Sequence, residues 1–252
     1  MLLSINTSTV QFSMALMEKS GSLMAEYVMT PASKSFKGFM PTLHDLLTRS
    51  SLKADQIEAL IVARGPGSFT GLRVGLSAAK GFCQGLGIPI IGVSGLEAMV
   101  NQVPHTTHPI CPIINSRKGE VFAALFQWSD MGKRVRMKED SCLPMEDLPS
   151  FIEGKTLFLG NDFSGQGSEI VKTCGQKALL APAHLWNLRA SAVGALGLER
   201  FQQQDYDELQ DLVPFYLRPP DFRHNPFPLP KHEMAAGVSD GERALTNHAR
   251  KY

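Results

Sequence analysis

One glycine-rich stretch, residues 65–75, constrains the fold of this chain more than any other part of its sequence. It reads Gly-Pro-Gly-Ser-Phe-Thr-Gly-Leu-Arg-Val-Gly and lies between an apolar run at 59–62 and an apolar pattern without proline until Pro89. The run predicts a buried strand, and the pattern predicts a helix over about residues 70–86. Gly-Pro-Gly favours a tight turn, and Ser68 or Thr70 can cap the helix. The resulting glycine-lined helix N-terminus admits an anion or another backbone segment at close range.

The stretch matches neither of the common nucleotide-binding patterns. A phosphate-binding loop needs lysine after its last glycine, where this chain has Leu72, and the glycine spacing does not fit the dinucleotide fingerprint. Two interpretations stay open at this point. Gly65, Gly67 and Ser68 line a cleft that holds an anion, or the glycines only allow a tight turn and close packing of the helix.

The rest of the sequence predicts an α/β protein with two lobes. Strands are expected at 2–6, 12–17, 23–29, 59–62, 90–93, 110–115, 120–126 and 156–159, and helices at 39–47, 70–86, 94–100, 168–174 and 189–203. Residues 131–149 are charged and are expected to be irregular. Ile5-Asn6 and Ile114-Asn115 each end an apolar run and precede a polar turn and a second apolar run. This weak internal repeat predicts two lobes of similar design, and two unrelated hairpins are the alternative.

A change of composition at residues 102–109 indicates a boundary between two lobes. The first lobe is expected over 1–102 and the second over 103–218, with the last helix of the second lobe packing back on the first. Residues 219–252 are rich in proline, histidine and charge and are expected to form an extended or disordered tail.

The composition excludes several classes of function. The 252 residues hold 25 Lys+Arg and 24 Asp+Glu, so the chain has no global basic field for binding nucleic acid independently. The 4 cysteines lie far apart, which argues against a metal cluster and fits a reduced, cytoplasmic compartment. No basic n-region, signal-peptide core or membrane-length apolar run is present, so no membrane association is expected.

The stretch at 65–75 resembles the hallmark of the bacterial TsaB (YeaZ) family, whose members belong to the machinery that makes threonylcarbamoyladenosine at position 37 of tRNAs. Weaker landmarks agree in order: residues 5–9, 114–122, 159–161 and 215–218. The resemblance covers about residues 1–218. It implies a two-lobed α/β fold of the actin-like (sugar-kinase and chaperone-ATPase) type. It also implies a non-catalytic scaffold or activator that pairs with the catalytic subunit TsaD and recruits the ATPase TsaE, while tRNA is reached through the complex.

The chain departs from the family pattern at two positions. Many members have Asp where Asn6 and Asn115 stand. In actin-like phosphotransferases, acids at such positions help to organise Mg²⁺, which prefers carboxylate ligands, and an amide cannot act as a base at neutral pH. We therefore expect no intrinsic cofactor, with ATP and Mg²⁺ handled by the partner subunits. Asn6 and Asn115 are assigned to the same cleft as Gly65, Gly67 and Ser68, with no catalytic and no metal-ligating residue.

The resemblance also implies a partner surface on two helices. Their apolar and small residues are expected to pack on matching helices of TsaD, or on a second copy of this chain when TsaD is absent. The predicted interface residues are Met40, Leu43, Leu47, Leu72, Gly75, Leu76, Ala79 and Cys83. The alternative is that both apolar strips are buried against the chain's own sheets, and we expect each helix to do some of both. An independent actin-like ATPase or kinase is the alternative function. A peptidase is disfavoured, because no Ser/His/Asp or metal-ligand arrangement stands out.

Overall fold

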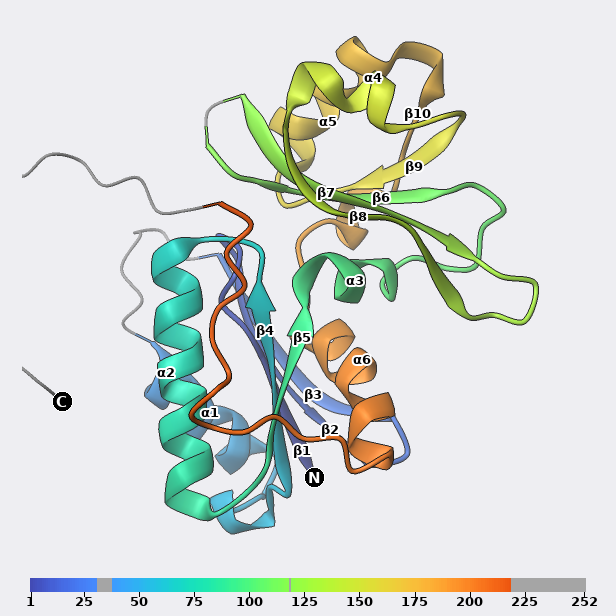
Figure 1. The fold of residues 1–252 in the computed structure, drawn as a ribbon. Coiled ribbons are helices and arrows are strands. Elements are labelled where there is room, and N and C mark those ends of the chain that lie inside the picture. Colours follow the sequence, from blue (N-terminus) through green and yellow to red (C-terminus); the bar gives the residue numbers. More distant parts are fainter. Residues whose placement is uncertain (31–37, 118, 219–252) are drawn as a thin grey trace, which may run out of the picture. The chain divides into compact units, whose positions relative to one another are not determined.

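The computed structural model describes residues 1–30, 38–117 and 119–218, and these residues form two lobes, each built on a five-stranded sheet (Figure 1). The first sheet has the order β3-β2-β1-β4-β5 and the second the order β10-β9-β6-β7-β8. The strands of the first sheet are β1 (Leu2–Asn6), β2 (Phe12–Met17), β3 (Leu23–Met29), β4 (Ala59–Gly65) and β5 (Ile90–Ser94). Those of the second are β6 (Ile110–Asn115), β7 (Glu120–Trp128), β8 (Arg134–Pro144), β9 (Thr156–Leu159) and β10 (Ala178–Leu180).

The two sheets repeat one topology. In each, a central strand pairs antiparallel with the strand that follows it in sequence, as in β1 with β2 and β6 with β7. On its other side the central strand pairs parallel with the fourth strand of the lobe, β4 or β9. Asn6 ends β1 and Asn115 ends β6, so the two asparagines occupy equivalent places. The predicted two-lobed α/β fold is confirmed.

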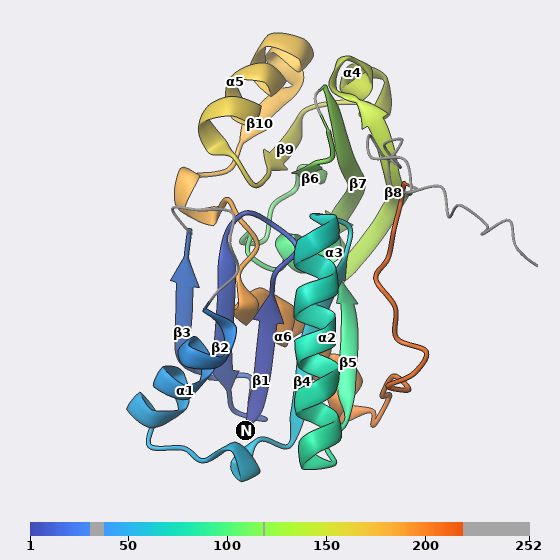
Figure 2. The ribbon, with the colours of Figure 1, turned by 90° about the vertical axis from the view of Figure 1, so that its left-hand side faces the viewer.

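Helices cover both faces of the first sheet. The helices are α1 (Phe39–Arg49), α2 (Phe69–Leu86), α3 (Gly95–Val100), α4 (Leu148–Phe151), α5 (Phe163–Cys174) and α6 (Ala190–Gln202). Figure 2 shows α1 and α2 in front of the first sheet and α6 behind it. Leu3 and Ile5 accordingly pack with α1 and α2, whereas Leu2 belongs to the core that α6 shares. Coverage on both faces explains why these strands are apolar without alternation.

The last helix of each repeat ties the two lobes together. α6 follows β10 in the sequence but packs on β1, β2, β4 and β5 of the first sheet. α3 follows β5 and contacts β6 and β7 of the second sheet as well as β4 and β5. All residues of α3 except Glu97 are buried, so this short helix is a central part of the core between the sheets.

Strand β8 lies where the charged sequence was expected to be irregular, so that prediction is wrong. Along this edge strand the alternation is inverted, because Val135 and Met137 are exposed whereas Arg134 and Arg136 are partly buried. The guanidinium of Arg136 lies over the ring of Phe126, 4.5 Å from its centroid. The strand forms because it pairs with β7 along its length. Its arginines point inward, so its hydropathy pattern does not indicate a strand.

The chain continues after α6 as a strap, defined here as residues 205–218. The Asp207 N–H donates to the carbonyl of Ile90 at 3.0 Å, and the Phe215 N–H donates to that of Arg64 at 2.7 Å. Leu212 is buried, whereas Val213 and Tyr216 are exposed. The tail predicted for 219–252 lies outside the described residues, as do residues 31–37 and 118.

Candidate functional site

The glycine stretch forms the predicted strand, turn and helix. β4 ends at Gly65, and α2 begins at Phe69. Ser68, and not Thr70, is the cap: its Oγ accepts a hydrogen bond from the Gly71 N–H at 3.2 Å. Gly65 and Gly67 have φ angles of 129° and 157°, which side-chain-bearing residues rarely adopt. The local conformation therefore follows from the residues of the stretch itself.

The turn that follows β1 fills the space in front of these glycines. The Ser68 N–H donates to the Ser8 carbonyl at 2.7 Å, and the Thr7 Oγ1 donates to the Gly71 carbonyl at 2.7 Å. A Cβ on Gly71 would overlap the Thr7 carbonyl oxygen, and one on Gly75 would overlap the Thr7 side chain. The glycines thus allow close packing within the chain. Two N–H groups that an anion would need, those of Ser68 and Gly71, are already bonded.

Asn6 is fully buried beside this turn and uses its whole amide. Its Oδ1 accepts from the N–H and Oγ of Ser8, at 2.9 and 2.7 Å. Its Nδ2 donates to the Leu188 carbonyl at 2.8 Å and to Thr9 Oγ1 at 3.2 Å. Leu188 precedes α6, and the neighbouring Asn187 N–H donates to the Gly160 carbonyl of the second lobe at 2.7 Å. Asn6 therefore joins the first lobe to the segment that crosses between lobes.

Asn115 has different surroundings although its place in the repeat is the same. It is exposed, and its Oδ1 accepts from Gln166 Nε2 at 2.9 Å. The nearly buried Gln166 in turn accepts from the Asn161 and Asp162 N–H groups at 2.9 and 3.0 Å. This network stays within the second lobe.

The structure therefore brings part of the predicted cleft together. Asn6, Gly67 and Ser68 meet around Ser8, and Asn115 has no hydrogen bond to any of them among the described residues. Gly65 packs against the backbone of Phe215 in the strap. Within residues 1–30, 38–117 and 119–218, no group of three or more His, Cys, Asp and Glu side chains is placed to hold a metal ion.

Most residues predicted to meet a partner are buried in the first lobe. The buried ones are Leu43, Leu47, Leu72, Gly75, Leu76, Ala79 and Cys83. Burial also raises the pKa of the Cys83 thiol to about 12. These positions pack against the chain's own sheet and turn, which agrees with the alternative that the apolar strips are buried within the chain, and their role towards a partner stays a prediction. Met40, with 62% of its surface exposed, is the member of the predicted set that faces solvent.

The opposite side of α2 is exposed, and we call it the outer face of α2. It consists of Thr70, Arg73, Ser77, Gly81 and Gln84. A Cβ on Gly81 would meet no atom within 4 Å, whereas Gly75 on the buried side is tightly enclosed. In the sequence, small and polar residues at helical spacing indicate this exposed face, whereas the predicted interface residues lie on the apolar side of the helix.

Aromatic residues extend the outer face at the start of α2. The Arg73 guanidinium lies over the Phe69 ring, 3.8 Å from its centroid, and its Nε donates to the Tyr216 hydroxyl at 3.0 Å. The Phe69 and Tyr216 rings are 5.2 Å apart. Phe69 and Tyr216 are each 37% exposed. The strap and the helix therefore present aromatic surface next to the outer face of α2.

Known proteins are similar to this chain over most of its length. The tRNA threonylcarbamoyladenosine biosynthesis protein TsaB of Bacillus subtilis (strain 168) is 31% identical over 220 residues, which cover 86% of this chain and 93% of that protein. The chain belongs to the TsaB family. A second TsaB, from Haemophilus influenzae (strain ATCC 51907 / DSM 11121 / KW20 / Rd), is 27% identical over 233 residues, covering 86% of this chain and 93% of its own length. The predicted family is thereby confirmed.

Two further comparisons place the TsaB-family chain among related folds. The family model described as TsaD, tRNA N6-adenosine threonylcarbamoyltransferase, matches residues 31–145. The structure of YeaZ from Pseudomonas aeruginosa superimposes with a TM-score of 0.72 at 22% identity, covering 86% of this chain and 99% of that one. The fold is therefore that of YeaZ. Among the described residues, no helix has the length and hydropathy that crossing a membrane requires.

Proposed function

We propose that this TsaB-family chain is a non-catalytic partner of a TsaD-like catalytic subunit in forming N6-threonylcarbamoyladenosine at position 37 of tRNAs. The observation that carries the proposal is the likeness to a TsaB over 93% of that protein's length. The match of residues 31–145 to the TsaD model supports a partner of related fold. A TsaE-like ATPase completes the proposed complex. The balanced charge of the chain supports contact with tRNA through the complex and not by this chain alone. We place the complex in the cytoplasm.

The residues at the ends of β1 and β6 support a role without chemistry of its own. Asn6 and Asn115 present neutral amides where an actin-like phosphotransferase would use carboxylates to hold Mg²⁺. The Asn6 amide is, in addition, fully occupied by hydrogen bonds within the chain. We therefore assign ATP and Mg²⁺ to the partner subunits and no intrinsic cofactor to this chain.

The outer face of α2 is the surface that we assign to pairing. Glycine in an exposed helix costs about 1 kcal/mol relative to alanine, and Gly81 touches nothing in the single chain to offset that cost. Small residues such as Ser77 and Gly81, one turn apart, let a second helix approach closely. Since TsaD resembles this region, the two chains can pair through equivalent helices, and a second copy of this chain can take the same place.

Placing a large side chain on this face tests the assignment. We expect Gly81→Leu to weaken pairing with the TsaD-like subunit at least about tenfold, because the leucine would hold the two helices apart. Folding should be unaffected or slightly more stable, since the substitution improves helix propensity. Sedimentation velocity with a titration of the partner measures the pairing, and urea unfolding measures the stability.

Lys172→Leu supplies the matched control. Lys172 lies exposed on α5, the counterpart of α2 in the second lobe, and the same leucine there should leave pairing unchanged. If Gly81→Leu pairs with native affinity, the outer face of α2 is not the interface. If the native chain itself does not bind a TsaD-like subunit, the proposed function fails.

A further inference from the structure

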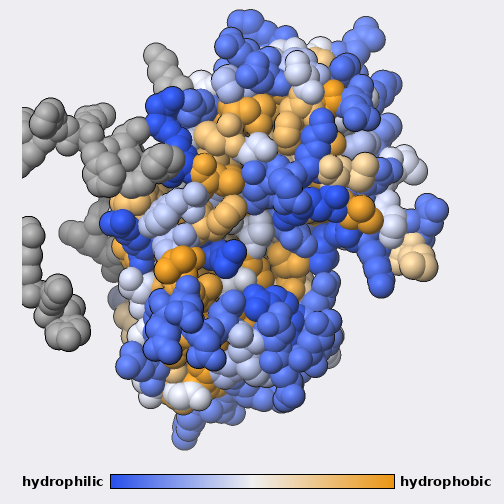
Figure 3. All heavy atoms as spheres, viewed as in Figure 1, coloured by the Kyte–Doolittle hydropathy of each residue, from blue (hydrophilic) through white to orange (hydrophobic). Residues whose placement is uncertain are grey.

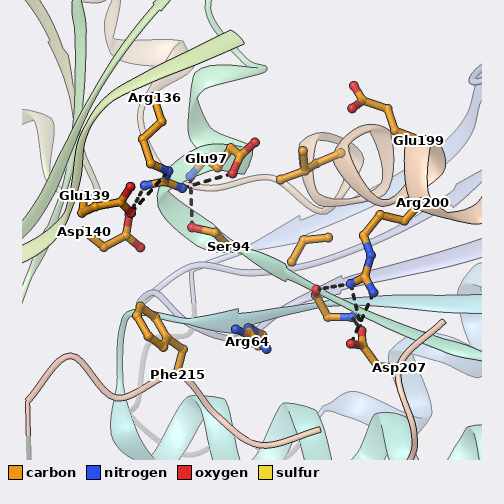
Figure 4. A pocket seen from close by; sticks show the side chains of 13 residues that line it. Arg64, Ser94, Glu97, Arg136, Glu139, Asp140, Glu199, Arg200, Asp207 and Phe215 are labelled. Carbon is orange, nitrogen blue, oxygen red and sulfur yellow. Dashed lines mark hydrogen bonds and ion pairs between the residues drawn. The ribbon is translucent and has the colours of Figure 1, made fainter. Parts of the chain in front are cut away.

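A charged pocket of about 740 Å³ lies where the carboxyl ends of β4 and β5 meet β8, α6 and the strap (Figure 4). Its polar walls comprise Arg64, Ser94, Glu97, Arg136, Glu139, Asp140, Glu199, Arg200 and Asp207. Small molecules often bind outside the carboxyl ends of parallel strands in α/β sheets. Figure 3 shows all heavy atoms in the view of Figure 1. Hydrophilic residues dominate this face, and hydrophobic surface lies in patches between them.

Arg64 is the pocket's unbalanced cation. Among the described residues its guanidinium has no carboxylate and no hydrogen-bond acceptor. It lies over the Phe215 ring, 5.8 Å from the ring centroid. Arg200, in contrast, is held by Asp207 at 3.0 Å and by Asp205 at 2.6 Å. Figure 4 shows Arg64 between Phe215 and Asp207, on the floor of the pocket. A guanidinium in such a place favours a planar, bidentate anion such as a carboxylate.

The wall contributed by β8 has more carboxylates than guanidinium groups. Arg136 pairs with three acids there, Glu97 at 3.1 Å, Glu139 at 3.9 Å and Asp140. Glu97 is also paired with Arg134 at 3.7 Å, whereas Glu139 and Asp140 have Arg136 as their cation among the described residues. Burial raises the pKa of the Asp140 carboxyl, and the neighbouring Glu139 and Glu97 add to the effect. Glu139 keeps 88% of its side chain exposed, so its carboxylate is accessible to a cationic group.

The lining charge selects a class of ligand. The pocket holds five carboxylates and three guanidinium groups, so a polyanion such as a nucleoside triphosphate or an RNA backbone would be repelled. A simple cation would face Arg64. Val93, Leu196 and Phe215 add apolar surface between the charges.

We propose that this pocket binds a small zwitterion, an amino acid or short peptide, with its carboxylate on Arg64 and its ammonium group on Glu139. Arg64 belongs to the first lobe and Glu139 to the second, so one ligand would contact both lobes. The proposal is independent of the pairing surface, and it is tested on the full chain alone.

Calorimetry with defined probes tests this site. The standard L-amino acids and glycyl-L-phenylalanine are screened by thermal shift at about 10 mM, and each probe that stabilises the chain is titrated calorimetrically. We expect at least one of them to bind. Its amide, which lacks the carboxylate, and its N-acetyl derivative, which lacks the ammonium group, should each bind at least about tenfold more weakly.

Two variants separate the charges. Arg64→Gln should lose the preference for the free probe over its amide, and Glu139→Gln should lose the preference over the N-acetyl derivative. Glu139 is exposed, so its variant remains informative even if Arg64→Gln folds poorly, and Glu153→Gln, exposed outside the pocket, should bind as the native chain does. Absence of binding by every probe at about 10 mM overturns the proposal, as does equal binding of a probe and both derivatives.

Discussion

Replacing Gly71 by alanine should lower the free energy of unfolding by about 2–3 kcal/mol, although the residue lies in a helix that alanine would normally stabilise. The added Cβ would overlap the carbonyl oxygen of Thr7, which is backbone and cannot rotate away. Relief would require α2 to move from the turn after β1. Such a shift would strain the hydrogen bonds from Thr7 Oγ1 to the Gly71 carbonyl and from the Ser68 N–H to the Ser8 carbonyl.

Urea unfolding of Gly71→Ala beside Gly81→Ala measures this effect within one helix. Gly81 is surrounded by open space, so its alanine variant should be more stable than the native chain by up to about 1 kcal/mol. The two variants carry the same chemical change, and their opposite signs would isolate the contact with Thr7. Equal stability of Gly71→Ala and the native chain would show that the glycine stretch is not packed as described.

Asn6→Asp should destabilise the fold by about 3 kcal/mol at neutral pH, because it replaces an amide donor by a buried negative charge. The Nδ2 hydrogen bond to the Leu188 carbonyl would become a repulsion between two oxygen atoms. Ser8 would still donate to the remaining oxygen. The Leu188 carbonyl before α6 would then keep only the longer hydrogen bond from Ser13 Oγ, at 3.4 Å, among the described residues.

The penalty should depend on pH with a definite sign. Burial without a cation raises the pKa of an aspartate above its unfolded value of about 4. A raised carboxyl pKa means that the folded variant binds the proton more tightly, so its deficit relative to the native chain shrinks as the pH falls towards about 4 and grows as the pH rises. Unfolding of both chains at about pH 5 and pH 8 measures this difference.

Asn115→Asp is the matched control for Asn6→Asp. The same change at the equivalent place in the second lobe should cost less than about 0.5 kcal/mol, because the exposed carboxylate can still accept from Gln166. A loss at Asn6 that is small, or the same at both pH values, would contradict the role given to its amide.

The glycine stretch shows how far the sequence carries a prediction. Its strand, turn and capped helix follow from local chemistry, and the structure has them where they were expected. Which face of the helix is buried depends on the turn after β1, more than 60 residues earlier in the chain, so Gly75 and Gly81 could not be told apart by spacing. The sequence therefore predicts both core packing and partner contact for the apolar face, and the structure shows it packed in the core.

The sequence also indicates the internal repeat, because the repeat is local. It does not indicate how the surroundings of the two repeated asparagines differ. Ile5-Asn6 and Ile114-Asn115 revealed the duplication because both end the central strand of a sheet. The surroundings of the two asparagines differ because only Asn6 meets the segment before α6, a long-range contact. The pocket escaped prediction because β8 turns Arg134 and Arg136 inward and exposes Val135 and Met137, so its hydropathy pattern does not indicate a strand.

Modification of tRNA by the reconstituted subunits tests the central claim most directly. A TsaD-like and a TsaE-like subunit, with tRNA, ATP, Mg²⁺ and the threonylcarbamoyl donor, are assayed for N6-threonylcarbamoyladenosine with the native chain, with Gly81→Leu, and without the chain. We expect modification with the native chain, a rate reduced at least about fivefold with Gly81→Leu at partner concentrations near the native Kd, and none above background without the chain. Modification at the full rate without this chain would contradict its role as the partner subunit.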